Sequence, residues 1–333
     1  MRNLANTQFS ILELVPVRDD KTVRFSLEHA LELAQAAEKL GYARLWLAEH
    51  HNMDGIASSA TAVLLGYLLA NTQTLKVGSG GIMLPNHAPL VVAEQFGTLA
   101  TLYPERVELG LGRAPGTDQI TMRALRRGRQ ETEEQFPQDV LEILQYFKDP
   151  IAGQRIVATP GYSTYVPVWL LGSSLFSAQL AAKLGLPYSF ASHFAPRMLS
   201  QAIQLYRENF EPSEYLDKPY VSMGVPTCIA ETDEEAQYLA TSAYQRVLAL
   251  IRGQSLKLKA PIENMQGLWS PAEKMSVDNF FAMAQVGSPN TVKTGLENLL
   301  QRYEVDEFIF TCDIYDTQKR IQNFEYLMQI KEL

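Results

Sequence analysis

Three adjacent side chains that could move protons, Glu49, His50 and His51, directly follow an apolar run over 44–48. An imidazole can take up or release a proton near neutral pH. Two histidines could also bind a metal ion, but no further His or Cys follows at the spacing that metal sites use. His50 is therefore either a proton-transfer residue or a histidine with a structural hydrogen bond, and we expect no metal.

A glycine-rich run, Val77-Gly78-Ser79-Gly80-Gly81-Ile82, ends the next apolar segment. Three glycines in four residues indicate a backbone that turns tightly or that a ligand approaches closely. The run alone does not decide between a tight turn and a ligand surface.

Arg113 follows a further apolar run in Gly110-Leu111-Gly112-Arg113-Ala114-Pro115-Gly116. This segment superficially resembles a dinucleotide-binding fingerprint. However, Pro115 stands where the helix should open, and no acidic residue ends a second strand about 20 residues later. We interpret Arg113 instead as an anion-binding side chain, because guanidinium suits phosphate recognition.

A second candidate for anion binding is Gly172-Ser173-Ser174, with Ser177 one turn later, between a strand-like and a helix-like segment. Free N–H groups at a helix N-terminus attract phosphate, and serine hydroxyls add donors. Simple capping of the helix by serine is the alternative. Because Arg113 follows a different strand, the two elements together favour a phosphate site.

Strand-like and helix-like segments that could position these residues alternate along the chain. Eight strands are predicted, over 9–14, 44–48, 75–79, 107–111, 168–171, 188–191, 221–229 and 307–311. The intervening helices are predicted over 26–40, 60–70, 90–103, 132–147, 174–184, 196–209, 234–251 and 290–303, with a helical tail over 317–330. The strands are short and apolar, which is typical of a parallel sheet covered by helices.

Eight such repeats favour a closed (β/α)₈ TIM barrel over an open doubly wound α/β sheet. We expect one barrel domain over 1–333. Active sites of this fold lie at the C-terminal face of the strands, where all the motifs above fall. Two stretches that break the rhythm, 112–131 and 252–276, are predicted loop insertions at that face, either lids or insertions without a role in the site.

Composition excludes several classes of protein. A net charge of −8 without a dominant basic face argues against nucleic-acid binding. The two cysteines, Cys228 and Cys312, form no disulfide framework. No secretory signal is apparent, and the longest nearly apolar stretch, 56–70, is too short to cross a membrane. We expect a cytoplasmic protein.

The helices over 60–70 and 90–103 are apolar nearly all round, whereas an outer barrel helix should have one polar face. We expect the helix over 60–70 to expose Val63, Leu64, Tyr67 or Leu68. Soluble monomers avoid such a patch, so we expect a homodimer in which these two helices of each chain meet.

Five segments resemble, in order, blocks of the bacterial luciferase-like monooxygenases: 46–51, 75–85, 110–113, 172–174 and 286–289. The resemblance extends over about 9–326. It is strongest to a group with Glu-His-His-Asn and Leu-Pro-Asn-His-Ala-Pro.

The resemblance implies a reduced FMN (FMNH₂) at the top of the barrel. In the family, the residues matching Gly80 and Gly81 form a cis peptide against the flavin ring, and those matching Arg113, Ser173, Ser174 and Ser177 hold the phosphate. Ser79 and Gly172 complete the expected cofactor-binding set. The match of His50 implies a catalytic acid–base group.

The activity implied is a two-component monooxygenase: a separate flavin reductase supplies FMNH₂, which with O₂ oxidises a small organic substrate. Light-emitting luciferases have a reactive cysteine where this chain has Gly112, so light emission is not expected. Two alternatives stay open, a deazaflavin-dependent dehydrogenase on the same fold and a non-catalytic flavin-binding protein.

Overall fold

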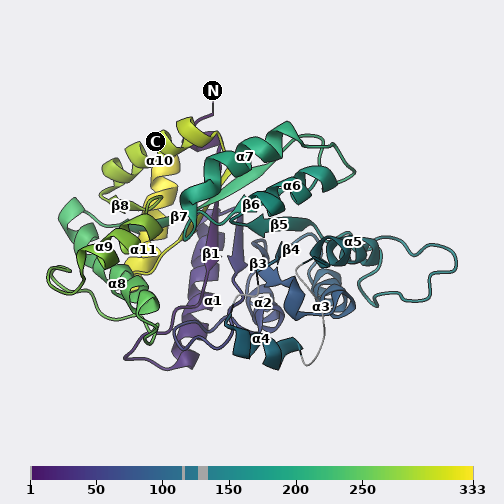
Figure 1. The fold of residues 1–333 in the computed structure, drawn as a ribbon, viewed down its shortest axis with the longest axis horizontal. Helices are drawn as coiled ribbons and strands as arrows, with labels where there is room; N and C mark the ends of the chain where they lie inside the picture. The colour runs from purple at the N-terminus through teal and green to yellow at the C-terminus, as the bar shows by residue number, and fades with distance from the viewer. Residues whose placement is uncertain (1, 115–116, 127–133, 333) are drawn as a thin grey trace.

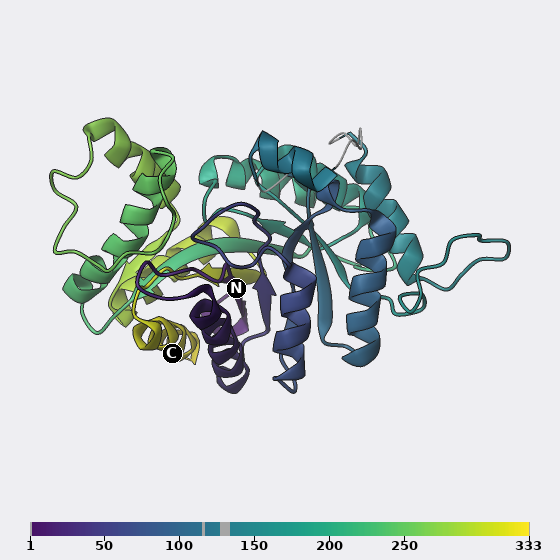
Figure 2. The same ribbon diagram turned by 90° about the horizontal axis from the view of Figure 1, so that it is seen from below.

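A closed barrel of parallel strands surrounded by helices forms the centre of the molecule (Figures 1 and 2). The computed structural model describes residues 2–114, 117–126 and 134–332. In that part of the chain, eight strands follow one another round the barrel in the order β1, β2, β3, β4, β5, β6, β7 and β9. Pairing of β9 with both β7 and β1 closes the barrel. The predicted TIM barrel is therefore confirmed.

All eight predicted strands are present. They are β1 (Gln8–Glu13), β2 (Arg44–Leu47), β3 (Lys76–Met83), β4 (Val107–Gly112), β5 (Val168–Gly172), β6 (Tyr188–Phe190), β7 (Val221–Ile229) and β9 (Glu307–Thr311). β3 runs four residues further than predicted, because the glycine-rich run stays extended beside β4 instead of turning.

Most of the helices also match their predicted positions. They are α1 (Val23–Leu40), α2 (Thr61–Ala70), α3 (Pro89–Leu102), α4 (Gln119–Arg126), α5 (Phe136–Phe147), α6 (Leu175–Leu184), α7 (Leu199–Glu208), α8 (Asp233–Ile251), α9 (Pro271–Phe280), α10 (Pro289–Tyr303) and α11 (Thr317–Glu332). α1 ends at Gly41, whose φ of 79° is the left-handed conformation that glycine adopts easily. α5 begins at Phe136; residues 132–133 of its predicted start lie outside the described residues.

The predicted insertion over 252–276 is only partly a loop. The Ser270 hydroxyl accepts the Glu273 N–H and the Glu273 carboxylate accepts the Ser270 N–H, a capping box that starts α9. A short strand, β8 (Gln285–Gly287), then pairs with β7. α8 and α9 form a lobe on one side of the barrel (Figure 2).

The part of this insertion before α9 lies against loops that follow β1 and β2. The Leu256 N–H donates to Asp54 Oδ1 at 2.9 Å, and the Leu258 N–H donates to Val17 O at 2.8 Å. Of the other predicted insertion, 112–131, residues 115–116 and 127–131 lie outside the described residues, and the described part contains α4.

A cluster of charges fills the lower part of the barrel interior. Arg44 of β2 is buried between Glu108 of β4 and Glu307 of β9, with 2.9 Å between Arg44 Nε and Glu108 Oε2. The indole N–H of Trp46 donates to the same carboxylate at 3.0 Å. Burial would lower the pKa of Arg44, but the two carboxylates raise it. The Arg44 guanidinium thus links β2, β4 and β9, and through Glu108 it helps to fix the indole ring of Trp46.

The expected exposure of α2 is partly wrong. Leu64 and Leu68 face the core and are 8% and 0% exposed, whereas Val63 and Tyr67 face outward at 76% and 40%. On α3, Val91 and Leu102 are exposed as well. The sequence could not assign the faces of α2, because all sides of this helix are apolar.

None of the helices within the described ranges has the length and apolar character needed to cross a membrane.

Replacing Arg44 by Met should lower the free energy of unfolding by about 3–5 kcal/mol, because the buried carboxylates of Glu108 and Glu307 would both lose their guanidinium partner. Urea denaturation measures this. The control is Arg24→Met, which breaks the exposed Arg24–Glu28 pair and should cost less than about 1 kcal/mol. Equal effects of the two substitutions would contradict a structural role for the buried cluster.

Candidate active site

A cavity of about 580 Å³ opens at the C-terminal ends of the barrel strands. The structure brings eight of the nine predicted site residues to its wall: His50, Gly80, Gly81, Arg113, Gly172, Ser173, Ser174 and Ser177. They come from the ends of β2, β3, β4 and β5 and from the start of α6. Residues that are up to 127 positions apart in the sequence therefore share one cavity.

Gly80 and Gly81 form one side of the cavity, and the peptide bond between them is cis, as the family resemblance implies. Neither position has room for a side chain. A Cβ at Gly80 would lie 2.7 Å from Leu12 Cδ1, and one at Gly81 would lie 2.7 Å from Gly110 O. The backbone itself is therefore the surface that a bound molecule would meet.

Ser79 is the predicted site residue that does not line the cavity. Its side chain is fully buried, and its hydroxyl donates to Gly110 O at 2.9 Å and accepts the Gly110 N–H at 3.1 Å. Ser79 thus joins β3 to β4 directly beside the two glycines. In the present geometry its hydroxyl supports the cavity wall and is not offered to a ligand.

The predicted phosphate site lies where β5 passes into α6. Ser174 is the N-cap residue of α6, but its side chain makes no capping hydrogen bond. The Ser177 hydroxyl donates to Ser174 O at 3.1 Å, and a Cβ at Gly172 would lie 2.1 Å from that hydroxyl oxygen. From the end of β4, the Arg113 guanidinium lies 4.3 Å from the centre of the Phe176 ring. The serines and Arg113 therefore converge as the sequence predicted.

His50 lines the cavity from the loop after β2, and its Nδ1 is buried with no hydrogen-bond partner among the described residues. Burial, together with the positive charge of Arg246, lowers the pKa of His50 to about 4. The ring is thus neutral at pH 7. A neutral imidazole offers one donor and one acceptor nitrogen.

The residues on either side of His50, Glu49 and His51, do not line the cavity and belong to a hydrogen-bonded cluster. The buried Glu49 Oε1 lies 2.8 Å from His51 Nε2 and 2.8 Å from His87 Nε2, and Oε2 accepts the Met83 N–H at 3.1 Å. Burial would raise the pKa of Glu49, but the bonds from His51 and His87 lower it to about 2. The cluster joins the loop after β2 to the segment after β3.

One ligand atom each of Glu49, His51 and His87 lies within 4.8 Å of the others, a spacing that could hold a metal ion. His87 was not predicted as a member of this cluster, because it is distant from the histidine pair in the sequence. Since Glu49 already accepts hydrogen bonds from both rings, we interpret the cluster as a clamp that fixes the direction of His50.

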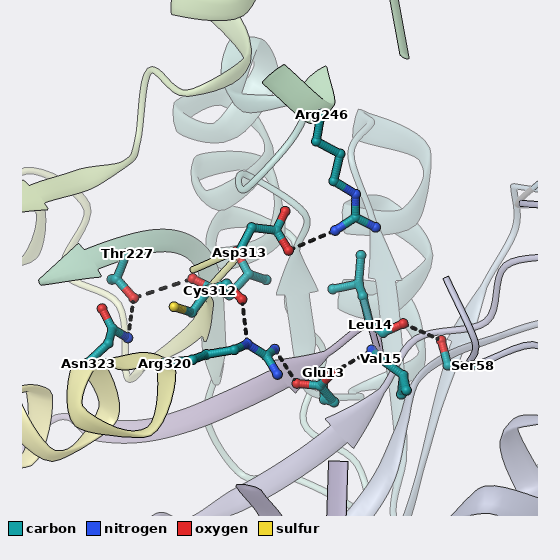
Figure 3. Close-up of polar contacts among 11 residues, drawn as sticks. Glu13, Leu14, Val15, Ser58, Thr227, Arg246, Cys312, Asp313, Arg320 and Asn323 are labelled. Atoms are coloured by element: carbon teal, nitrogen blue, oxygen red, sulfur yellow. Dashed lines mark hydrogen bonds and ion pairs between the residues drawn. The ribbon is translucent and has the colours of Figure 1, made fainter. Parts of the chain in front are cut away.

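Three charged residues of the cavity wall were not predicted either: Arg246, Asp313 and Arg320. Arg246 of α8 donates to Asp313 at 2.8 Å, and Arg320 of α11 donates to Glu13 and to Cys312 O (Figure 3). Arg246, Asp313 and Arg320 all line the cavity. These contacts join segments that are 67 and 307 residues apart, so no local pattern indicates them.

Glu49→Gln should lower the free energy of unfolding at pH 7 by about 1–3 kcal/mol, because the His51 and His87 donors lose a charged acceptor. The pKa of Glu49 is depressed in the folded state, so its stabilisation is present above pH 4.5 and is lost as the pH falls towards 2. Thermal unfolding from pH 7 to pH 3 measures the loss.

Glu32→Gln is the matched control, because it changes an exposed carboxylate that contacts a single histidine, His29, and should have little effect. A chelator should leave the melting temperature of the wild type unchanged. A lower melting temperature in chelator would show a metal ion in place of the clamp, and a fully stable Glu49→Gln protein would contradict both readings.

Comparisons with known proteins identify the family of this chain and agree with its fold. The family model described as luciferase-like monooxygenase matches residues 7–307. A luciferase-like monooxygenase of Escherichia coli K12 is 52% identical over 324 residues, which is 97% of each chain. The crystal structure of apo-MsnO8 has a TM-score of 0.92 and 32% identity, and covers 98% of this chain and 99% of that chain.

Two further structures show the same fold at 16% identity. One is the oxygenating constituent of 3,6-diketocamphane monooxygenase from Pseudomonas putida in complex with FMN, with a TM-score of 0.73 and 97% of each chain covered. The other is an F420-dependent secondary alcohol dehydrogenase, with a TM-score of 0.70 and 98% and 99% of the two chains covered. With a family match over nearly its whole length, this chain belongs to the luciferase-like monooxygenase family.

Proposed function

We propose that the chain is an FMN-dependent monooxygenase of the two-component type, which uses reduced FMN and O₂ to oxidise a small organic substrate. The observation that carries the proposal is one cavity of about 580 Å³ that joins the glycine wall at Gly80–Gly81, the Arg113–serine cluster and His50. Cavities of this size hold cofactors and small ligands in other proteins. A separate reductase would supply the reduced flavin.

The chemistry of the donors fits FMN. Arg113 and the hydroxyls of Ser173, Ser174 and Ser177 would hold the phosphate at the N-terminus of α6, where the helix dipole favours an anion. Gly80 and Gly81, where a Cβ would clash, would lie against the flat ring system. The bound flavin would supply the reaction with oxygen, which protein side chains cannot perform.

The residues of the chain itself would orient the substrate, hold the proton and exclude water. His50 would hold a proton at its accessible ring nitrogen, since the Glu49 clamp fixes the backbone on both sides of it. Apolar side chains from α8, the following loop and α9, among them Leu250, Leu256 and Phe280, also line the cavity and would keep water away from the reaction.

The FMN complex of the structurally similar diketocamphane monooxygenase supports FMN as the cofactor. The second candidate, a deazaflavin-dependent dehydrogenase, has support from the F420-dependent alcohol dehydrogenase on the same fold. A longer anionic cofactor tail would need further cations. Of the other arginines that line the cavity, Arg246 and Arg320 are already paired with Asp313 and Glu13, which favours FMN.

The non-catalytic alternative, a protein that only binds flavin, is less well supported, because His50 lines the cavity and is held in place by neighbouring residues.

Arg113→Ala should weaken FMN binding by about 1.5–3 kcal/mol, roughly ten- to hundredfold, because a charge-assisted contact to the phosphate is lost. Binding of riboflavin, which has no phosphate, should not change. Titration calorimetry measures both ligands. Arg302→Ala is the matched control, since Arg302 lies over the ring of Tyr303 as Arg113 lies over that of Phe176, but outside the cavity. Equal affinity of the wild type for FMN and riboflavin would refute the phosphate site.

We further propose that the protein forms a two-fold dimer through α2 and α3. Val63 and Tyr67 on α2 and Val91 and Leu102 on α3 leave an apolar surface on two neighbouring helices. Gly66, by contrast, faces Leu99 of α3, where an added Cβ would lie 3.4 Å from Leu99 Cδ2, so it serves the packing of α2 on α3 within one chain. A second copy of the chain offers the same apolar surface and can cover it symmetrically.

Val63→Glu combined with Tyr67→Glu should convert the dimer into a monomer, because four carboxylates would meet at the centre of the interface. Sedimentation equilibrium at micromolar concentration measures the mass. Val23→Glu, which changes an exposed apolar residue of α1, should leave the dimer intact. A wild type that sediments as a monomer would refute the dimer.

A further inference from the structure

His193 is a histidine of the cavity wall to which the proposed function gives no role. It lies in the loop between β6 and the short helix η3 (Pro196–Met198), and it lines the cavity. The Ser192 hydroxyl holds this loop by donating to Gly224 O of β7 at 2.7 Å. The ring itself packs on Gly224, where a Cβ would lie 2.3 Å from His193 Nδ1. Its position is therefore fixed, and it depends on the glycine beneath it.

His193 resembles His50 in an unusual respect. In both residues Nδ1 is buried and has no hydrogen-bond partner among the described residues. Both rings line the cavity, so Nε2 is the nitrogen that remains accessible from it. A protonated ring would leave an Nδ1–H buried without an acceptor, which is costly. Each ring therefore rests in the neutral form and offers Nε2 to whatever lies in the cavity.

The barrel places the two histidines at opposite sides of its mouth. His50 follows β2 and His193 follows β6, and three strands separate β2 from β6 in either direction round the barrel. The rings are nonetheless close enough for their charges to interact: burial lowers the pKa of His193 to about 3, and His50 contributes to the lowering. Around His50 the other charged or titratable groups are Arg246 of α8, Glu49 and His51.

We infer that His193 is a second acid–base residue of the cavity, which contacts the same bound molecule as His50 from the opposite side. Two neutral rings can give one hydrogen bond and accept another. They suit a neutral molecule whose hydroxyl or carbonyl oxygen changes its protonation during the reaction. The substrate class is therefore an uncharged oxygen compound at the point of reaction, and the inference rests on the proposed function.

The proton step that this assigns needs no oxidant. When the ligand O–H bond breaks, the proton forms an N–H bond at Nε2 of one ring, and that ring becomes a cation. Because burial disfavours the charged ring, the ring releases the proton again to water or to the ligand. The two rings thus form a pair that takes up and returns one proton and ends each cycle neutral.

The test compares the wild type with His193→Gln and His193→Phe. Gln retains a hydrogen-bonding group near the place of Nε2 but cannot carry a proton, whereas Phe removes both functions. The control is His29→Gln. His29 of α1 is also buried with a ring nitrogen, Nε2, that has no partner among the described residues, but it does not line the cavity.

Two measurements are made on each protein. The first is the affinity for FMN, together with the ring ¹⁵N resonances of the histidines before and after FMN is added. The second is the rate at which the reduced-FMN complex is reoxidised by O₂ between pH 6 and pH 9. The affinity and the resonances are measured without turnover. The resonances can be followed in the wild type alone, so this part of the test does not depend on the folding of the variants.

FMN affinity should stay within threefold in all variants, and FMN should shift the resonances of His50 and His193 but not those of His29. His193→Gln and His193→Phe should both change the reoxidation rate at least about tenfold at every pH from 6 to 9, because both rings are neutral throughout this range, while His29→Gln matches the wild type. Wild-type kinetics in His193→Gln, or unshifted His193 resonances, would overturn the inference. A wild type that binds no FMN would instead refute the proposed function.

Discussion

The ion pairs buried in the lower half of the barrel support the residues that form the cavity in the upper half. Arg44, Glu108 and Glu307 fill the lower interior and tie together β2, β4 and β9, three strands spaced round the ring. Trp46 is attached to this cluster through Glu108 and forms, with Leu12 and Ile309, an apolar layer above it. The cavity begins at this layer. The ion pairs below the layer do not line the cavity, but they hold its floor in place.

Above this layer, two features form the site: glycines without side chains at the strand ends, and side chains from the loops that follow the strands. Gly80, Gly81 and Gly172 leave out side chains where a Cβ would collide with its neighbours. The loop after β2 adds His50, and the Glu49 clamp joins that loop to the segment after β3. The glycine backbone and the side-chain donors come from separate strands. The positions of the flavin, the His50 ring and the substrate relative to one another would therefore depend on closure of the barrel.

The parts that the sequence predicted are those with a local signal. Eight apolar runs fixed the strands, and Gly41 and Gly185 ended their helices through left-handed backbone conformations. The convergence of Arg113 with Ser173 and Ser174 followed from the rule that parallel strands end on one face. α9 and β8 were missed because both are short; α9 begins within the stretch over 252–276 that was interpreted as a loop, and β8 follows that stretch. His87, His193 and Arg246 were missed because the residues that they contact are distant in the sequence. The faces of α2 were misassigned because apolar residues surround the helix.

The proposed function depends most on where FMN binds, and a crystal structure of the protein with FMN tests this directly. It should show the phosphate within hydrogen-bonding distance of Arg113 and the serines at the start of α6, with the ring system against Gly80–Gly81 and His50 beside it. A phosphate that points into solvent, a reversed flavin, or FMN bound outside this cavity would contradict the account.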